Sequence, residues 1–183
     1  MIVEETYLKD CYIITPKVFN DDRGYFLETF NKKQFEESTG IKTSFVQDNQ
    51  SKSNKGVLRG LHFQTGKHAQ AKLVRVIKGS VLDVCVDLRK DSKTFGKYFS
   101  LVLDNVKHQQ LFVPKGFAHG FVVLEDNTVF AYKCDNYYNK EAEGGIIYND
   151  KTVNVDWKFS TDVLILSQKD KDLPTFKSVF NDN

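Results

Sequence analysis

Arg59 and His62 lie three residues apart in the segment 56–64, which is otherwise mostly apolar and punctuated by glycines. A charged side chain in a core strand is costly unless it is paired, and a histidine beside it can titrate near neutral pH. Together they indicate a pocket that holds an anion and moves a proton. Strict alternation would send the two side chains to opposite faces of a strand. A shared pocket therefore requires a bulge or a twist, which Gly60 would permit.

Other polar residues close to this segment in the sequence extend the candidate pocket. Lys72 follows the segment, and Asp48, Asn49 and Gln50 precede it. Such a set can bind a phosphate through charge-assisted hydrogen bonds while a neutral imidazole takes a proton. The alternative for His62 is a structural histidine bonded to the backbone, which is the commoner role of a lone strand histidine.

Tyr132 shares a face of the segment 128–134 with Phe130 and Cys134. Its ordinary interpretation is a core aromatic whose hydroxyl finds one hydrogen-bond partner. The functional interpretation is a phenol that donates a proton on the far side of a substrate from His62.

Two further segments combine charge with tight turns. Pro114 and the glycines around His119 predict a tight turn entering a strand. The segment 21–28 forms either a solvated loop with an edge strand, or a site that offers Arg23 to an anion and Phe26 to a flat ring. A metal site would require paired histidines with a carboxylate at suitable spacing. The histidines here are isolated, so we expect no metal.

The elements that would position these residues are mainly short strands. Apolar and polar residues alternate with a period near two in five segments: 81–88, 98–103, 110–113, 120–124 and 128–134. Polar or glycine-containing breaks separate them. Repeated short strands of this kind favour an all-β sandwich or barrel over alternating strands and helices.

Two short helices are expected at the edges of this β domain. Asn31 can act as an N-cap with Gln34 three residues later, and Gly40 can end the helix after Phe35. A second helix is expected near the C-terminus, with Pro174 in its first turn.

Length and composition exclude several classes of protein. The 183 residues fit one domain, 1–183, and 26 Lys and Arg nearly balance 24 Asp and Glu, without a basic stripe for nucleic acid. Cys11, Cys85 and Cys134 form no CxxC pair, so zinc-ribbon and dithiol sites are unsupported. Acidic residues near the N-terminus and short apolar runs argue against a signal peptide or a membrane span. We therefore expect a cytoplasmic protein with no membrane partner.

Seven ordered blocks with compatible spacing run along nearly the whole chain. They are DRGYFLE at 22–28, FVQDN at 45–49, LRGLHFQ at 58–64, KLVRV at 72–76, VDLRKDS at 86–92, PKGFAHGF at 114–121 and YKC at 132–134. The tail segment LSQKD at 166–170 fits the same pattern. In these blocks the chain resembles the dTDP-4-dehydrorhamnose 3,5-epimerase family of nucleotide-sugar enzymes.

This resemblance implies a cupin-type jelly-roll barrel with a few short peripheral helices. It implies a homodimer whose N-terminal strand reaches the neighbouring subunit, and no metal or other cofactor. The implied catalytic residues are His62 as the base, Asp170 as the carboxylate that orients it, Tyr132 as the acid and Lys72 beside the ketone oxygen.

The resemblance also implies a set of substrate-binding residues. From the same chain they are Gln47, Asp48, Asn49, Arg59, Lys72, His119, Glu143 and Lys169. Arg23 and Glu28 would complete the neighbouring subunit's site. Phe26, Tyr137 and Tyr138 are all candidates for stacking on the thymine ring, and the sequence does not choose among them.

The expected reaction is conversion of dTDP-4-dehydro-6-deoxy-D-glucose to dTDP-4-dehydro-L-rhamnose by proton exchange at C3 and C5, a step of dTDP-rhamnose biosynthesis. One alternative is a C3-only epimerase of another deoxysugar pathway. Another is a non-catalytic sugar-binding cupin, because a fold alone does not determine a function. The joint presence of His62, Tyr132, Lys72 and Asp170 argues against the second alternative.

Overall fold

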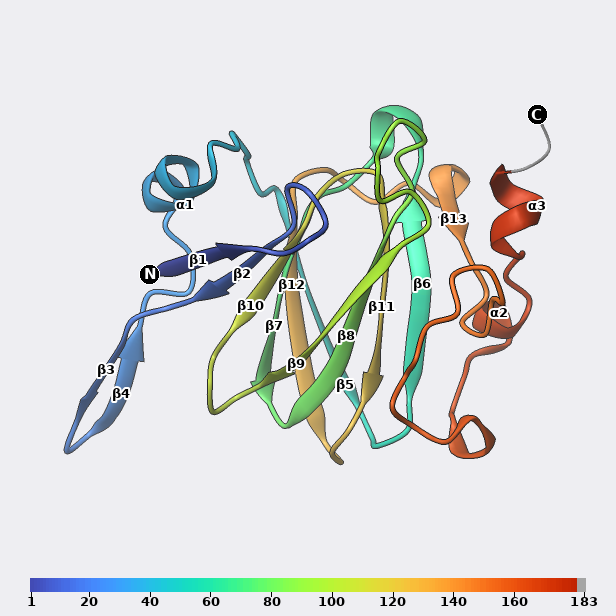
Figure 1. Cartoon of the computed structure of the whole chain (residues 1–183). Helices are drawn as coiled ribbons and strands as arrows, with labels where there is room; N and C mark the ends of the chain where they lie inside the picture. The colour runs from blue at the N-terminus through green and yellow to red at the C-terminus, as the bar shows by residue number, and fades with distance from the viewer. Residues whose placement is uncertain (181–183) are drawn as a thin grey trace.

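Two antiparallel β-sheets packed face to face make up most of the chain in the computed structural model, which describes residues 1–180 (Figure 1). The first sheet has the order β1 (Ile2–Glu5), β2 (Tyr12–Thr15), β10 (Gln110–Val113), β7 (Lys72–Lys78), β12 (Thr128–Cys134) and β5 (Gln47–Ser53). The second has the order β13 (Glu143–Gly145), β6 (Leu58–Gln64), β11 (Phe117–Val123), β8 (Ser80–Asp87) and β9 (Tyr98–Asp104). Strands distant in sequence are neighbours in both sheets, as in a jelly roll. The all-β expectation is confirmed.

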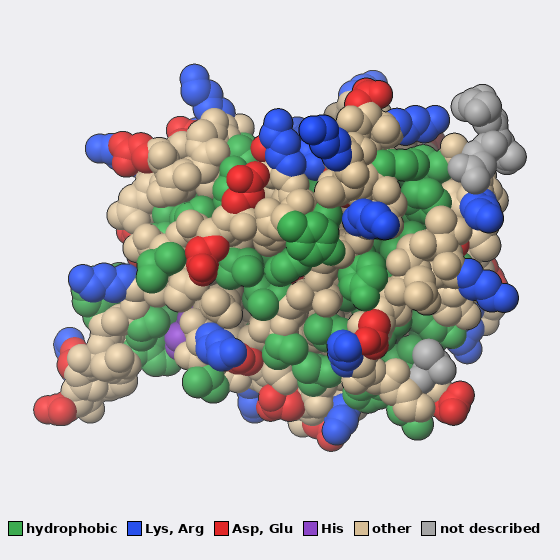
Figure 2. All heavy atoms as spheres, viewed as in Figure 1, with side chains coloured by type: hydrophobic (Ala, Val, Ile, Leu, Met, Phe, Trp, Pro, Cys, Tyr) green, Lys and Arg blue, Asp and Glu red, His purple; other side chains and the backbone are tan. Residues whose placement is uncertain are grey.

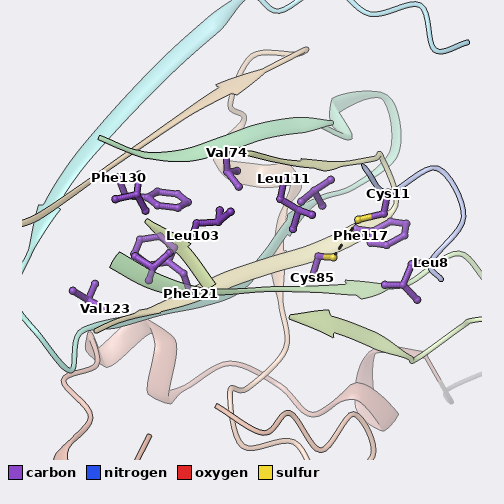
Figure 3. Close-up of a cluster of buried hydrophobic side chains, with 13 residues drawn as sticks. Leu8, Cys11, Val74, Cys85, Leu103, Leu111, Phe117, Phe121, Val123 and Phe130 are labelled. Atoms are coloured by element: carbon purple, nitrogen blue, oxygen red, sulfur yellow. Dashed lines mark hydrogen bonds between the residues drawn. The ribbon is translucent and has the colours of Figure 1, made fainter. Parts of the chain in front are cut away.

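The main hydrophobic core lies between the two sheets (Figure 3). Phe121 of β11 and Phe130 of β12 stack across it, with ring centroids 4.1 Å apart. Val81 and Cys85 of β8 point into this core, whereas Leu82, Val84 and Val86 belong to a second cluster on the outer face of the same sheet. β8 is therefore buried along its whole length.

The C-terminal part of the chain covers the outer face of the five-stranded sheet (Figure 1). Trp157 and Phe176 are buried against residues of β6, β8 and β11 in this second cluster. The segment contains η3 (Thr161–Val163), α2 (Gln168–Lys171) and α3 (Phe176–Phe180). The predicted C-terminal helix is present as α3, but it begins two residues after Pro174. The Oγ1 of Thr175 accepts a hydrogen bond from the backbone N–H of Ser178 at this start, so Pro174 precedes the helix.

Helix α1 (Lys32–Thr39) has the two ends that were predicted from the sequence. The side chain of Asn31 accepts a hydrogen bond from the backbone N–H of Gln34 at 3.1 Å, and Gly40 ends the helix with φ 72°. Phe35 packs against Phe112 of β10 with ring centroids 5.0 Å apart, so the helix covers part of the first sheet. The remaining short helices are η1 (Gly66–His68) and η2 (Lys140–Ala142).

Strands β3 (Val18–Asp21) and β4 (Gly24–Leu27) form a separate two-stranded hairpin that projects from the barrel (Figure 1). Figure 2 shows the hairpin standing clear of the rest of the surface, with acidic side chains at its tip. Phe19, Tyr25 and Phe26 are exposed on it. An isolated hairpin is marginally stable in water, so these exposed aromatic side chains indicate a surface that packs against something else.

A β-bulge in β6 places Arg59 and His62 on the same side of the sheet. In the pairing with β11, His62 lies opposite His119 and Arg59 lies opposite Phe121. Two residues of β6 therefore face the single Gly120 of the partner strand, which reverses the alternation by one step. Gly60 has φ 128°, and a Cβ atom there would come within 2.6 Å of the Gly120 Cα. The bulge expected from the sequence is confirmed.

Candidate active site

A cavity of about 700 Å³ lies between the two sheets and contains His62 and Tyr132. His62 enters from β6 of the five-stranded sheet, and Tyr132 enters from β12 of the six-stranded sheet. A smaller cavity of about 270 Å³ adjoins the first, because both are lined by Asn49, His62, Lys72 and Tyr132. The base and acid candidates therefore approach one space from opposite walls.

His62 is held by a carboxylate from the C-terminal segment. Its Nε2 lies 2.6 Å from Oδ1 of Asp170, and Asp170 is buried. Ser167 is the N-cap of α2 and donates from its hydroxyl to Asp170 Oδ2 at 2.7 Å. Burial by itself would raise the pKa of Asp170, but the hydrogen bonds from His62 and Ser167 lower the pKa below its usual value. Asp170 is thus ionised and can accept a hydrogen bond from His62 Nε2–H, in the tautomer that leaves a lone pair on Nδ1.

Lys72 and Tyr132 stand side by side on β7 and β12. The ammonium Nζ of Lys72 lies 5.9 Å from the centre of the Tyr132 ring. Burial raises the pKa of Tyr132 and lowers the pKa of Lys72, and nearby Cys134, Asp83 and Glu143 oppose the second shift. Tyr132 is therefore protonated at neutral pH and able to donate a proton.

His119 forms a second histidine–carboxylate pair in the same cavity. Its Nε2 lies 2.9 and 3.0 Å from the two oxygens of Asp83, which is buried on β8. The predicted tight turn is present at residues 114–116, where Gly116 has φ 81°, and it leads into β11, the strand that carries His119. The sequence analysis does not identify Asp83 as a site residue, because alternation alone does not say which face of the strand points to the cavity. A carboxylate between Leu82 and Val84 is the signal that would have found it.

Glu143, Tyr138 and Lys169 meet at the edge of the smaller cavity. Glu143 Oε2 accepts a hydrogen bond from the Tyr138 hydroxyl at 3.0 Å and lies 2.6 Å from Lys169 Nζ. Burial alone would raise the pKa of Glu143, but these two contacts lower it. Gln47 and Asn49 line the same cavity, and the Gln47 amide donates to Asn49 Oδ1 at 3.1 Å.

A family model described as dTDP-4-dehydrorhamnose 3,5-epimerase matches residues 5–178. The chain belongs to this epimerase family. The Shigella flexneri enzyme of that name is 52% identical over 170 residues, covering 93% of both chains. The Escherichia coli K12 enzyme is 52% identical over 175 residues, covering 96% of this chain and 94% of that one.

Solved structures of epimerases agree with this assignment. The crystal structure of dTDP-4-dehydrorhamnose 3,5-epimerase from Elizabethkingia anophelis is 57% identical, covers 97% of both chains and has a TM-score of 0.94. The Legionella pneumophila epimerase in complex with dTDP-4-keto-L-rhamnose is 45% identical, covers 95% of this chain and 92% of that one, and has a TM-score of 0.91.

Two of the binding residues expected from the epimerase resemblance differ from expectation in their surroundings. Asp48 lies between Gln47 and Asn49 on β5, so alternation turns it to the outer face, where it contacts Lys133 at 2.9 Å. It is not among the residues that line either of the two cavities described above. Arg59 does line the larger cavity, but its side chain is exposed and donates to Ser53 Oγ at 3.1 Å. The argument from a buried charge at Arg59 is therefore wrong.

Three other expected epimerase residues lie on or beside the projecting hairpin. Arg23 pairs with Asp21 at its tip, with 90% of its side chain exposed, and Phe26 is exposed beside Phe19. Glu28 follows directly after β4. None of the three lines the cavity of its own chain.

Among residues 1–180, no three His, Cys, Asp or Glu side chains are grouped as a metal site would require. None of the helices in this part of the chain is long and apolar enough to cross a membrane.

Proposed function

We propose that this epimerase converts dTDP-4-dehydro-6-deoxy-D-glucose to dTDP-4-dehydro-L-rhamnose, with His62 as the base and Tyr132 as the acid. One observation carries the assignment of roles: the two side chains reach one cavity from opposite sheets. Inversion of a carbon centre requires a proton to leave one face and another to arrive at the opposite face. A sugar ring between the sheets would present its two faces to these two groups.

The chemistry explains the other residues of the cavity. A hydrogen on a carbon next to a ketone becomes removable when the resulting enolate is stabilised. The ammonium group of Lys72 would stabilise the developing oxyanion electrostatically. Asp170 fixes the tautomer of His62 and favours the imidazolium that forms after proton removal, as a carboxylate does for other catalytic histidines.

Binding of the diphosphate would orient the ring for this reaction. Binding energy far from the reacting carbon can be used to position a substrate. Arg59 at the cavity is one anchor, and Arg23 on the projecting hairpin is the second. Because Arg23 lies away from its own cavity, we infer a homodimer in which the hairpin of one subunit brings Arg23, Phe26 and Glu28 to the site of the other.

Solvent exchange tests the assignment. The native enzyme incubated with the 4-keto sugar nucleotide in heavy water should place deuterium at both C3 and C5, as read by NMR of the product. His62→Ala should abolish incorporation at both carbons, because no base remains to remove a proton. Tyr132→Phe should retain exchange but lose inversion.

Each outcome has a clear consequence. Undiminished exchange in His62→Ala would refute the base assignment, and normal inversion in Tyr132→Phe would refute the acid assignment. Deuterium at C3 alone in the native enzyme would identify a C3-only epimerase. Ligand binding without any exchange would indicate a non-catalytic binding protein.

A further inference from the structure

The turn at residues 135–139 carries two exposed tyrosines at the edge of the smaller cavity. It joins β12 to η2 and contains no regular secondary structure. Tyr137 and Tyr138 are both exposed, and Tyr138 lines the cavity. Exposed loops of this kind are usually mobile, so a well-defined position for Tyr138 requires contacts that fix the backbone.

Three glutamine side chains supply such contacts, each from a different segment. The Oε1 of Gln47 accepts from the backbone N–H of Tyr138 at 3.1 Å. The Oε1 of Gln64 accepts from the backbone N–H of Asn139 at 3.0 Å. From the segment before β7, the Nε2 of Gln70 donates to the backbone carbonyl of Asn136 at 2.8 Å.

Gln64 and Gln70 have no role in the proposed reaction, and the hydrogen bonds fix the direction in which each side-chain amide points. Gln64 must present its oxygen, because its partner is an N–H donor, and Gln70 must present its nitrogen, because its partner is a carbonyl. Gln64 is buried at the end of β6, and both side chains line the smaller cavity. The backbone of the turn is therefore held by side chains that line the cavity.

Further hydrogen bonds connect these contacts to Asn139 and Glu143, which lie next to Tyr138. Asn139 caps η2 by accepting hydrogen bonds from the backbone N–H groups of Glu141 and Ala142. Glu143 follows η2, pairs with Gln64 in the β6–β13 ladder and accepts the hydrogen bond from the Tyr138 hydroxyl. Gln64 thus contacts Asn139, the residue after Tyr138, and pairs through its backbone with Glu143, the partner of the Tyr138 hydroxyl.

We propose that Gln64 and Gln70 are positioning residues that hold the backbone of 136–139, and thereby Tyr138, at the edge of the substrate cavity. The proposal rests on the proposed role of Tyr138 in substrate binding. Neither glutamine lines the larger cavity, where Asp170 and His119 lie. Their loss should therefore weaken binding of the nucleotide sugar and leave the proton-transfer step nearly intact.

The same substitution at the two positions gives opposite expectations. Gln64→Glu keeps an oxygen that accepts from Asn139, whereas Gln70→Glu replaces the donor to Asn136 with a second acceptor. Both changes add one negative charge to the same cavity, so the charge is matched. We expect the KM of Gln64→Glu to stay within about twofold of the native value, and the KM of Gln70→Glu to rise about tenfold with kcat little changed.

Gln64→Met tests the first contact without added charge, because it keeps the length of the side chain and removes the acceptor. We expect KM to rise about fivefold and the amide of Asn139 to exchange hydrogen faster, while amides of the β8–β11 ladder remain protected. An unchanged KM, or equal KM changes in both Gln→Glu variants, would overturn the proposal. If Gln70→Glu fails to fold, the comparison of Gln64→Met with Gln64→Glu decides.

Tyr138→Ala separates this inference from the proposed function. A raised KM in Tyr138→Ala together with a native KM in Gln64→Met would refute the positioning role alone. A native KM in Tyr138→Ala would refute the role of Tyr138 and the positioning proposal with it. In that case the assignment of His62 still stands or falls on its own exchange experiment.

Discussion

Two histidine–carboxylate pairs share one cavity, and they differ in how far the imidazole is exposed. The side chain of His62 is 28% exposed and that of Asp170 is 6% exposed, whereas the values for His119 and Asp83 are 7% and 0%. A group that exchanges protons with a substrate needs access to it, and a group that only donates a hydrogen bond needs a fixed orientation. The difference in burial therefore supports His62 as the base and His119 as a fixed contact.

Replacing Asp83 with Asn should weaken catalysis by disturbing His119. The substitution removes the charge that fixes the imidazole while leaving an oxygen in place. Loss of one charge-assisted hydrogen bond predicts a decrease in kcat/KM of about tenfold. Steady-state kinetics would measure it, with Asp87→Asn as the control on the same strand away from the cavity. A native kcat/KM in Asp83→Asn would show that His119 needs no carboxylate.

Residue types alone identified part of this cavity. His62, Tyr132 and Lys72 stand out because polar groups are unusual in apolar strands, and the structure brings all three together. Asp83 was not recognised because both faces of β8 are covered, which a period-two pattern on its own does not reveal. The roles of Asp170 and Lys169 came only from the family resemblance, since they reach the cavity from a separate segment.

The bulge in β6 is the element that makes the cavity possible. Gly60 adopts a conformation that other residues rarely take, and its Cα hydrogens face Gly120 across the ladder. This feature could be predicted from the sequence. Arg59 and His62 are three residues apart, so their side chains can share one pocket only if a bulge places both on the same face of the strand. The ends of α1 were equally predictable from the cap at Asn31 and the glycine at 40.

Gly60→Ala should therefore damage both stability and activity. The new Cβ would meet the Gly120 Cα at 2.6 Å and the His119 carbonyl oxygen at 2.9 Å. We expect the free energy of unfolding to fall by roughly 2–3 kcal/mol, measured by urea denaturation, with a lower kcat. Gly24→Ala is the control, because Gly24 has φ 125° and nothing within 4 Å of its Cβ position. Equal losses in both variants would show that the close approach is unimportant.

Elements whose position depends on distant packing could not be predicted from local sequence. The C-terminal segment covers the five-stranded sheet through Trp157 and Phe176, which are far apart in sequence from the strands they contact. The projection of the β3–β4 hairpin was likewise not evident from its alternation. The positions of both elements depend on contacts with residues far away in the sequence, which a short stretch of sequence does not reveal.

One ionic network joins distant parts of the whole molecule at one end of the barrel. Arg89 contacts Asp87 at 2.9 Å, Asp10 at 3.0 Å and the backbone carbonyl of Lys9 at 3.0 Å. It thereby ties the turn between β1 and β2 to the loop after β8. Burial would raise the pKa of Asp87, but hydrogen bonds from Arg89, Ser92 and Thr94 outweigh it and lower the pKa to about 2.

This network predicts how stability depends on pH. An unfolded Asp titrates near pH 4, so Asp87 contributes on the order of 2 kcal/mol above that pH, and the contribution is lost as pH falls toward 2. Urea denaturation of the native protein and Asp87→Asn should therefore differ at pH 7 and converge near pH 2. A constant difference across this range would contradict the assigned ionisation.

Mixing of subunits tests the proposed homodimer. His62→Ala and Arg23→Ala should each be nearly inactive alone. In a mixed dimer, one site would combine the intact His62 of one subunit with the intact Arg23 of the other. Random exchange should then restore about one quarter of the native sites, measured as epimerase activity after refolding the two variants together. Failure to recover activity would place Arg23 in the site of its own chain, and full activity of Arg23→Ala alone would place it outside any site.

Asp170 is separated from His62 by 108 positions and lies in the C-terminal segment, which forms an outer layer over the five-stranded sheet. A chain in which only this outer layer has unfolded would keep its two sheets and the core between them. It would nevertheless lose the carboxylate that orients its base. Mild heating or limited proteolysis should therefore abolish epimerase activity before circular dichroism detects the loss of β-structure.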